Sequence, residues 1–384
     1  MASVLIIGGQ GRIGQAIAQD ILHHTDATVT VTRRSTVDQA SSAPSSSASS
    51  LLSRLIPAQL DVNDRASVQK AIAAHDLVID CAGPFHARST EVLQQCIQAG
   101  VHYLDVSDCA PFSRRALPLH DVAQQANVTA IINTGVFPGI SNAMARWGVE
   151  EFVQQLGRSP HSIRLYYGVA GSGGAGVTVM RTTFLGLQHP VTAWIDGQWQ
   201  TLKPYSDRQL VQFPPPIGTT GVYWYEVAET LTLAQSFPVQ TVVTKFGSVP
   251  DIYNRLTWAV AHWLPKRLLH NPDFIEDTAK MSYQMTQISD RFSGTGIAIV
   301  VEVAGNETKG ETEQCRLTLV HRDTAIAAGA GTGSLAQLIL AQKLQHPGVA
   351  PVETALATEL FRTMMQQRQI AIDCNWISKL TIVG

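Results

Sequence analysis

The segment that most constrains this fold is a glycine-rich run near the start of the chain. It follows an apolar run at residues 4–7, which is typical of a buried strand, and precedes residues 12–22, whose isoleucines recur on one helical face. Within the run, Gly9, Gly11 and Gly14 have the spacing G-x-G-x-x-G. A strand, this turn and a helix, in that order, predict the opening unit of a dinucleotide-binding sheet.

Each of these glycines has a separate physical reason. Gly9 permits a tight turn, Gly11 lets the backbone approach a pyrophosphate, and Gly14 lets the helix pack on the sheet. The N–H groups at the start of a helix favour an anion such as a diphosphate. The alternative is a ligand-free turn, but three glycines weaken a turn unless something must approach it closely. We therefore expect cofactor contacts from Gly9, Gln10, Gly11, Arg12, Ile13 and Gly14.

The end of the second predicted strand, at residues 28–32, distinguishes between the two nicotinamide cofactors. An NAD-binding chain usually has Asp or Glu there to accept a hydrogen bond from the ribose hydroxyl. This chain has Arg33 and Arg34 followed by Ser35. Two guanidiniums and a hydroxyl suit the extra phosphate of NADP, so NADP is favoured over NAD. The alternative is two solvated arginines beside a surface segment, residues 35–53, that is rich in Ser and Ala.

The first 133 residues continue this alternation of short apolar runs and helical periodicity. We expect further strands at residues 57–62, 77–81, 101–105 and 128–133, with helices at 66–74, 89–99 and 117–126. Repeated strand–helix units predict an α/β fold with a Rossmann-type doubly wound parallel sheet. Two loops should border the cofactor at strand ends, and their residues are Asp61, Val62, Cys81, Ala82, Gly83, Pro84 and Phe85. Asp61 could equally be an ordinary turn residue.

The sequence texture changes after residue 140. A helix at residues 140–155 is followed by β-like runs separated by loops rich in Gly and Pro. We interpret residues 134–333 as a second α+β domain for substrate binding and dimerisation. Residues 334–384 are expected to return to the dinucleotide-binding domain formed by residues 1–133.

Four segments together resemble the saccharopine dehydrogenase-like oxidoreductase family. They are residues 60–64 (LDVND), 80–85 (DCAGPF), 96–108 (CIQAGVHYLDVSD) and 135–142 (GVFPGISN). The resemblance implies a Rossmann-type domain joined to a substrate domain, with the C-terminal tail returning to the first. It also implies nicotinamide-dependent redox chemistry, although members of that family differ in their substrates.

An acid or base should lie near the ends of the later strands of the sheet. Tyr103 and Asp105 lie in a stretch that resembles the family's motif at that place, and Asp105 is the leading candidate to relay a proton. The alternative, which we weigh equally, is that Asp105 caps the following turn. His86 could also relay a proton, or it could be an ordinary loop residue.

Two further features of the second half have competing interpretations. Arg181 follows the glycine-rich loop 171–176 and could hold a carboxylate, although a solvated arginine explains it more simply. The run at residues 329–333 (GAGTG) could bind an anion before a helix, or Thr332 or Ser334 could cap that helix.

Composition excludes several other classes of protein. The formal net charge of −2 gives no long-range attraction for nucleic acid. The histidines and cysteines lack the spacing of a metal site, and no G-x-S-x-G motif of a serine hydrolase is present. The five cysteines form no C-x-x-C pair, and a strand is expected almost at once, so a cytoplasmic location without a signal peptide is expected.

The sequence has no apolar run of the ~18 residues that an integral membrane segment needs. Residues 256–269 form the most apolar helical candidate, with Trp258, Trp263 and a basic end. We interpret this stretch as a partly buried helix, the alternative being a helix that docks on a membrane or a partner. The sequence leaves monomer and homodimer open.

Together these features predict an NADP(H)-dependent oxidoreductase acting on a small molecule. Hydride would move to or from a C=N, C=O or C=C bond of a substrate that the sequence does not identify. The alternative is a non-catalytic NADP(H)-binding or sensor protein.

Overall fold

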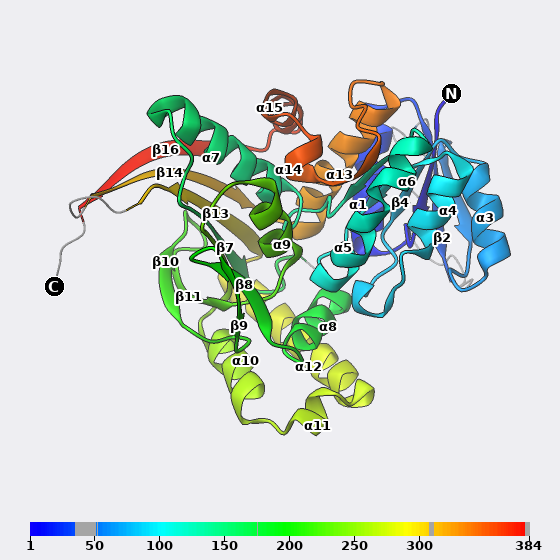
Figure 1. Ribbon diagram of the computed structural model, residues 1–384. Coiled ribbons are helices and arrows are strands. Elements are labelled where there is room, and N and C mark those ends of the chain that lie inside the picture. The colour runs from blue at the N-terminus through cyan, green and yellow to red at the C-terminus, as the bar shows by residue number, and fades with distance from the viewer. Residues whose placement is uncertain (35–50, 52, 175, 307–310, 381–384) are drawn as a thin grey trace. The chain divides into compact units, whose positions relative to one another are not determined.

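The computed structural model describes residues 1–34, 51, 53–174, 176–306 and 311–380 of the chain (Figure 1). Contacts divide the chain into two compact units. Unit 1 comprises Met1–Ile140 and Ala325–Met365, and unit 2 comprises Ser141–Thr324 and Gln366–Gly384.

Unit 1 is built on a sheet of seven parallel strands in the order β15-β6-β5-β4-β1-β2-β3. The strand order reverses between β1 and β4, which is the topological switch point of a doubly wound sheet. The strands are β1 (Ser3–Ile7), β2 (Thr28–Arg33), β3 (Leu55–Gln59), β4 (Leu77–Asp80), β5 (His102–Asp105), β6 (Thr129–Ile132) and β15 (Gly348–Pro351).

Helices and short 3-10 turns connect these strands. They are α1 (Arg12–His24), α3 (Arg65–Ala73), η1 (Phe85–Ala87), α4 (Glu91–Ala99), α5 (Ala110–Ala116), η2 (Leu117–Leu119), α6 (His120–Gln125), α13 (Thr324–Leu340), α14 (Val352–Ala355) and α15 (Thr358–Gln367). The apolar residues of α1 turn inward, since Ile17 and Ile21 are completely buried. Gly100 ends α4 with a left-handed φ of 69°, which glycine adopts readily at the end of a helix.

The glycines at residues 329–333 lie inside α13, so the prediction of an anion site or a cap at this run is wrong. A Cβ at Gly329 would lie 2.8 Å from the backbone of Ala16, and one at Gly333 would lie 2.1 Å from the Asp20 carboxylate. These small residues therefore let α13 pack closely against α1. The Thr332 hydroxyl donates to the Thr134 carbonyl at 3.0 Å.

Unit 2 contains a mixed sheet in the order β10-β11-β12-β7-β13-β14-β16, with β8 pairing with both β12 and β9. Its strands are β7 (Ser162–Ala170), β8 (Val191–Ile195), β9 (Gln198–Leu202), β10 (Gln209–Gln212), β11 (Thr219–Trp224), β12 (Thr241–Val249), β13 (Gly296–Ala304), β14 (Glu311–His321) and β16 (Ile372–Leu380). Its helices are α7 (Ile140–Leu156), α8 (Val177–Gly186), α9 (Ala228–Ser236), α10 (Ile252–Trp263), α11 (Lys266–Leu269) and α12 (Pro272–Ser293).

The C-terminal tail divides between the two units. β15 pairs with β6 and belongs to unit 1, whereas β16 pairs with β14 along its whole length and belongs to unit 2. The expectation that all of residues 334–384 return to the first domain is therefore wrong for the last strand, because that strand completes an edge of the second sheet. The divisions fall at residues 140 and 325 rather than at 133 and 333.

The apolar stretch at residues 256–269 forms two helices rather than one. α10 ends at Trp263 and α11 begins at Lys266, because Pro265 between them cannot continue the α-helix. Within the described residues, no helix is both long enough and apolar enough to span a bilayer.

Candidate cofactor and catalytic site

The glycine turn joins β1 to α1 through close backbone contacts. The Gly9 amide donates to the Ile6 carbonyl at 3.1 Å, and the Gly11 amide donates to the Gly8 carbonyl at 2.9 Å. A Cβ at Gly14 would lie 2.5 Å from the Cα of Gly9, so neither position has room for a side chain. α1 follows with Gly11 as its N-cap, and no side chain caps it. The helix therefore starts as a diphosphate site requires.

The turn also touches the loop that follows β4. Gly8 has a φ of +73°, and its Cβ position lies 3.0 Å from the Cys81 carbonyl oxygen. Burial and the neighbouring carboxylates of Asp80 and Asp105 raise the pKa of the Cys81 thiol well above its usual value. The predicted loop residues thus lie beside the glycine turn, but the ring of Phe85 points into the core.

The ring of Phe85 packs edge-on against Phe112, with ring centroids 5.0 Å apart. Only the backbone of Phe85 is therefore available to a cofactor.

The end of β2 is attached to the same turn. The Thr32 hydroxyl accepts a hydrogen bond from the Gly8 amide at 3.2 Å, and the Thr32 carbonyl accepts one from Gln10 at 3.3 Å. Arg33 is half-buried and Arg34 is exposed. Neither guanidinium forms an ion pair with another residue of the described chain. Ser35 lies outside the described residues.

Asp61 occupies an exposed turn after β3. Its Oδ1 accepts hydrogen bonds from the backbone amide of Asn63 at 3.0 Å and from its side-chain amide at 3.1 Å. The geometry matches an ordinary Asx turn, the alternative that the sequence left open. Val62 packs against the core of unit 1.

Two buried carboxylates occupy the ends of adjacent strands. Asp80 ends β4 and Asp105 ends β5, and the two are paired in the register of the sheet. The Oδ1 of Asp80 accepts a hydrogen bond from the Ala82 amide at 2.9 Å, and its Oδ2 lies 3.7 Å from Arg88. Burial raises the pKa of Asp80, although the positive charge of Arg88 opposes the rise.

Asp105 is completely buried, and its two carboxylate oxygens differ. Oδ1 accepts hydrogen bonds from the amides of Ser107 at 3.0 Å and Asn133 at 2.9 Å, so Asp105 does cap the turn after β5. Oδ2 has no hydrogen-bond partner at ordinary geometry within the described chain. Burial raises the pKa of Asp105 to about 7, and those two amides and the nearby Tyr103 hydroxyl only partly offset it. Both interpretations of Asp105 are therefore compatible with its surroundings.

Three residues near Asp80 or Asp105 received no role from the sequence. Asn133 fixes the turn, since its side-chain amide donates to the Ser107 carbonyl at 2.7 Å. Burial raises the pKa of Asp108, and the positive charge of His86 opposes that rise. Arg88 lies beside Asp80. One sequence signal could have identified these residues, namely their position after strands. In a parallel sheet, polar residues that follow adjacent apolar strands lie at the same edge.

Tyr103 is completely buried, and burial raises the pKa of its hydroxyl well above the usual value. It therefore remains a neutral phenol. A carboxyl group that titrates near neutral pH, placed at the strand ends of a doubly wound sheet, can give or take a proton during turnover.

Arg181 of unit 2 does not point to a free carboxylate site. Its Nε donates to Glu276 at 2.7 Å, so an internal partner already engages the guanidinium. Asp290 fixes the preceding glycine loop, since its carboxylate accepts from the Ser172 amide at 2.8 Å and from its hydroxyl at 2.6 Å. Across the residues that the structure describes, no group of three or more His, Cys, Asp or Glu could hold a metal ion.

The seven-stranded parallel sheet and its glycine turn define unit 1 as a Rossmann-type dinucleotide-binding domain. A family model described as the saccharopine dehydrogenase NADP binding domain matches residues 4–131. Residues 4–131 therefore form an NADP-binding domain of the saccharopine dehydrogenase type. The predicted resemblance of this domain to the family, the predicted fold class and the prediction of NADP are confirmed.

Two relatives show how far the likeness extends. Saccharopine dehydrogenase [NADP(+), L-glutamate-forming] of Pyricularia oryzae is 33% identical over 95 residues, which is 25% of this chain and 20% of that protein. Apo saccharopine dehydrogenase (L-Glu forming) from Saccharomyces cerevisiae matches with a TM-score of 0.68 and 15% identity. That match covers 98% of this chain and 100% of the yeast chain, so the fold extends over both units.

Proposed function

We propose that the protein is an NADP(H)-dependent oxidoreductase that reduces or oxidises a C=N, C=O or C=C bond of a small molecule. One observation carries the proposal. β2 ends at Arg33, Arg34 follows it, and no acidic residue stands at this strand end. The same strand end lies beside the glycine turn, to which Thr32 is hydrogen-bonded. Guanidiniums at this position suit a 2′-phosphate, and a carboxylate would repel it. When bound, NADPH supplies the hydride.

The chain's own residues would bind the cofactor and move the proton. The α1 N-terminus would hold the diphosphate, and the backbone after β4 would line the nicotinamide side. Asp105 would donate or accept a proton through Oδ2, because the hydrogen bonds that fix the turn use Oδ1. Tyr103 would oppose the effect of burial by lowering the pKa of that carboxyl group.

We also propose a cytoplasmic location and a small-molecule substrate. Five cysteines without a C-x-x-C pair fit a reducing compartment. The substrate would be held by unit 2, in keeping with the role that we assign to the second domain.

The double variant Arg33→Ala/Arg34→Ala tests the cofactor assignment. Calorimetry should show NADPH binding weakened by about 2–4 kcal/mol, because charge-assisted bonds to the 2′-phosphate are lost. NADH binding should barely change. Arg65→Ala is the control, since Arg65 is exposed and pairs with Glu91. Equal losses for the two cofactors would refute the 2′-phosphate role.

Oxidation of NADPH in the presence of imines, aldehydes and enones tests the reaction itself. Deuterium from C4-deuterated NADPH should appear in the product, because hydride transfer is direct. Tight NADPH binding without oxidation across a broad panel would instead favour the non-catalytic sensor.

A further inference from the structure

Two helices of unit 2 have apolar side chains on faces that do not point into the core. The inner faces are conventional: Asn254 of α10 is completely buried, and Ile275 and Ala279 of α12 belong to a core cluster. A helix at a protein surface normally places charged and polar residues on the opposite face. α10 and α12 depart from this pattern.

The outer faces carry two apolar stripes with helical spacing. On α10 the stripe consists of Ile252, Leu256 and Trp263, and Trp263 is 75% exposed. On α12 it consists of Met281, Met285, Ile288 and Phe292, with Ile288 62% and Phe292 87% exposed. Steps of three, four and seven residues keep each stripe on one side of its helix. Among the described residues, eight of the sixteen exposed large apolar side chains fall between 252 and 292.

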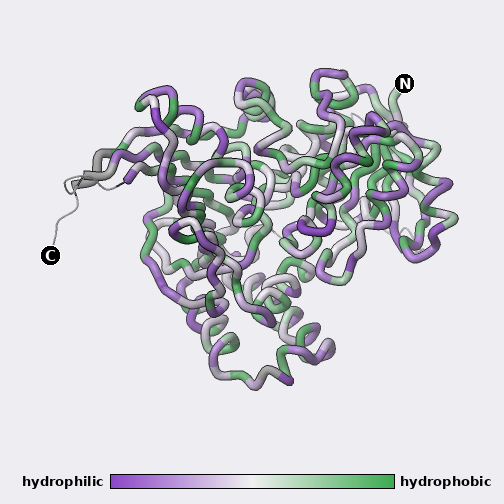
Figure 2. The backbone as a smooth tube through the Cα atoms, in the orientation of Figure 1, coloured by the Kyte–Doolittle hydropathy of each residue, from purple (hydrophilic) through white to green (hydrophobic). Residues whose placement is uncertain are grey.

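The stripes lie on neighbouring helices. The Tyr253 hydroxyl donates to the Met285 carbonyl at 3.1 Å, which ties the start of α10 to α12. Figure 1 shows α10, α11 and α12 grouped in one part of unit 2, and Figure 2 shows hydrophobic segments running through them. We call these outer faces, with the α11 turn between them, the α10–α12 surface.

The charge around this surface is one-sided on α10 and α11. Residues 252–271 contain no Asp or Glu, but contain Arg255, Lys266, Arg267 and two histidines. Arg267 is exposed, and Arg255, which is 75% exposed, makes only a weak surface pair with Asp251.

The acidic residues of α12 lie off its stripe or before it. Glu276 is paired with Arg181 and Lys280, and Asp290 is hydrogen-bonded to Ser172. The two others, Asp273 and Asp277, precede the stripe, which begins at Met281.

We propose that the α10–α12 surface binds the surface of an anionic lipid bilayer. Helices with exposed Trp, Phe and Leu on one face and Lys or Arg beside it lie in the plane of the lipid headgroups. The basic flank would then meet anionic headgroups, which attract such residues. A second copy of the chain would also cover the apolar side chains. A two-fold contact, however, tends to place like charge against like charge, and so leaves the acid-free flank unexplained.

Flotation of the full-length protein with vesicles tests this proposal. Vesicles of phosphatidylcholine and phosphatidylglycerol at about 3:1 should bind the protein, and phosphatidylcholine alone should bind it several-fold less, with added salt weakening the first interaction. Absence of binding to the anionic vesicles would overturn the proposal. So would equal binding to both kinds of vesicle that does not respond to salt.

Paired variants locate the contact. Leu256→Ser/Trp263→Ser and Met285→Ser/Phe292→Ser should each lower the vesicle partition coefficient by roughly tenfold or more, since buried apolar area drives this binding. The matched control is Trp199→Ser/Leu210→Ser, which removes exposed apolar side chains of the same unit outside the surface. An equal loss in the control would refute the assignment. Light scattering is the second measurement: a wild-type dimer that the two test variants convert to monomer, without vesicle binding, would show that a second copy covers this surface.

Discussion

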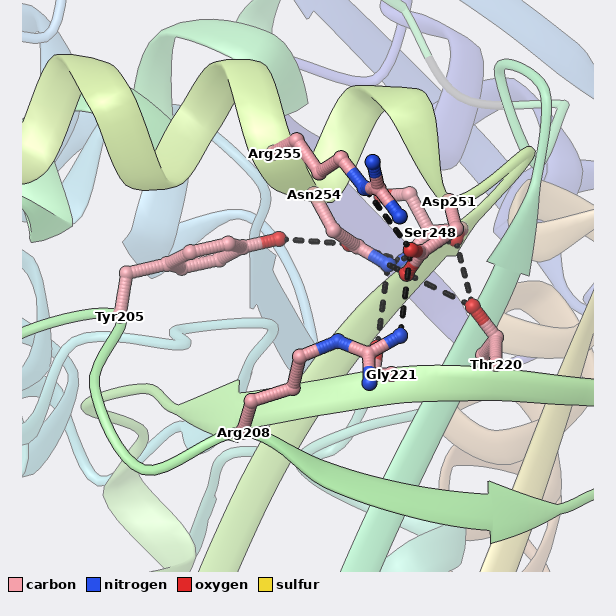
Figure 3. A network of polar contacts seen from close by, with 8 residues as sticks. All are labelled: Tyr205, Arg208, Thr220, Gly221, Ser248, Asp251, Asn254 and Arg255. Atoms are coloured by element: carbon pink, nitrogen blue, oxygen red, sulfur yellow. Dashed lines mark hydrogen bonds and ion pairs between the residues drawn. The ribbon is translucent and has the colours of Figure 1, made fainter.

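The two units treat a buried polar side chain in opposite ways. In unit 2, Asn254 is completely buried and every polar atom of its side chain is used (Figure 3). Its Oδ1 accepts hydrogen bonds from the Tyr205 hydroxyl at 2.8 Å and the Ser248 amide at 2.7 Å. Its Nδ2 lies within hydrogen-bond distance of Gly221 O, Ser248 O, Asp251 Oδ1 and Thr220 Oγ1.

In unit 1, Asp105 is equally buried, but only one of its carboxylate oxygens is hydrogen-bonded at ordinary geometry within the described chain. The pKa values show the consequence. Burial dominates at Asp105 and raises its pKa to about 7. At Asp251, partial burial is outweighed by Asn254 and Arg208, and the pKa is lowered.

The comparison separates a structural network from a candidate for chemistry. At Asn254 all polar atoms are hydrogen-bonded, which fixes the turn before α10 and leaves no atom for a ligand. At Asp105 a buried carboxylate oxygen without a partner lowers stability, and such a cost is typical of functional sites. The spare capacity lies at the strand ends of the parallel sheet, where cofactors bind in this fold class.

The largest effect is expected from Asp105→Asn. In the folded state Asp105 keeps its proton up to about pH 7. In the unfolded state its carboxyl group has the ordinary pKa of 3.8. Wild-type stability should therefore fall as pH rises from about 4 to 7 and then level off, at a cost of about 4 kcal/mol. Asp105→Asn should lose most of this pH dependence and be more stable than the wild type at pH 8. Its turnover should nevertheless fall far more than its affinity for NADPH.

Urea titrations at pH 5 and pH 8 can measure this effect in unit 1 alone. A brief alkylation pulse at a common pH, read by mass spectrometry at the buried Cys96, reports the unfolding of that unit. Asp26→Asn is the control, since Asp26 is exposed. If the variant kept the wild-type pH dependence, burial of Asp105 would not be the cause. If turnover were unchanged, Asp105 would have no part in the mechanism.

The next largest effect is expected from Asn254→Ala, which should lower the free energy of unfolding by about 3 kcal/mol. The substitution leaves the Tyr205 hydroxyl, the Ser248 amide and the Gly221 carbonyl without their partner in the interior. All seven tryptophans fall in unit 2, so tryptophan fluorescence during urea unfolding reports this unit. NADPH binding to unit 1 should be unaffected. A stability loss below about 1 kcal/mol would mean that water replaces the amide and that the network is not saturated.

The sequence predicted unit 1 better than unit 2 for a physical reason. The glycine spacing, the alternating strands and helices, and Arg33 and Arg34 are local signals, and each depends on residues close together in the chain. The partners of Asp105 and Asn254 come from several strands and turns, and no local pattern indicates which of them meet. Pairing of β16 with β14 is equally non-local, which is why the return of the tail was predicted only in part.

The smallest expected effect tests whether burial explains the importance of Asn254. Asn271 is also in unit 2 and also accepts two hydrogen bonds through Oδ1, from the amides of Asp273 at 2.9 Å and Phe274 at 3.2 Å. It caps α12 at the surface, where water can replace it, so Asn271→Ala should cost about 1 kcal/mol in the same fluorescence titration. Asn271→Ser should restore most of that loss, because serine also caps helices. Equal losses at Asn254 and Asn271 would mean that the number of hydrogen bonds, rather than their burial, sets the stability of this unit.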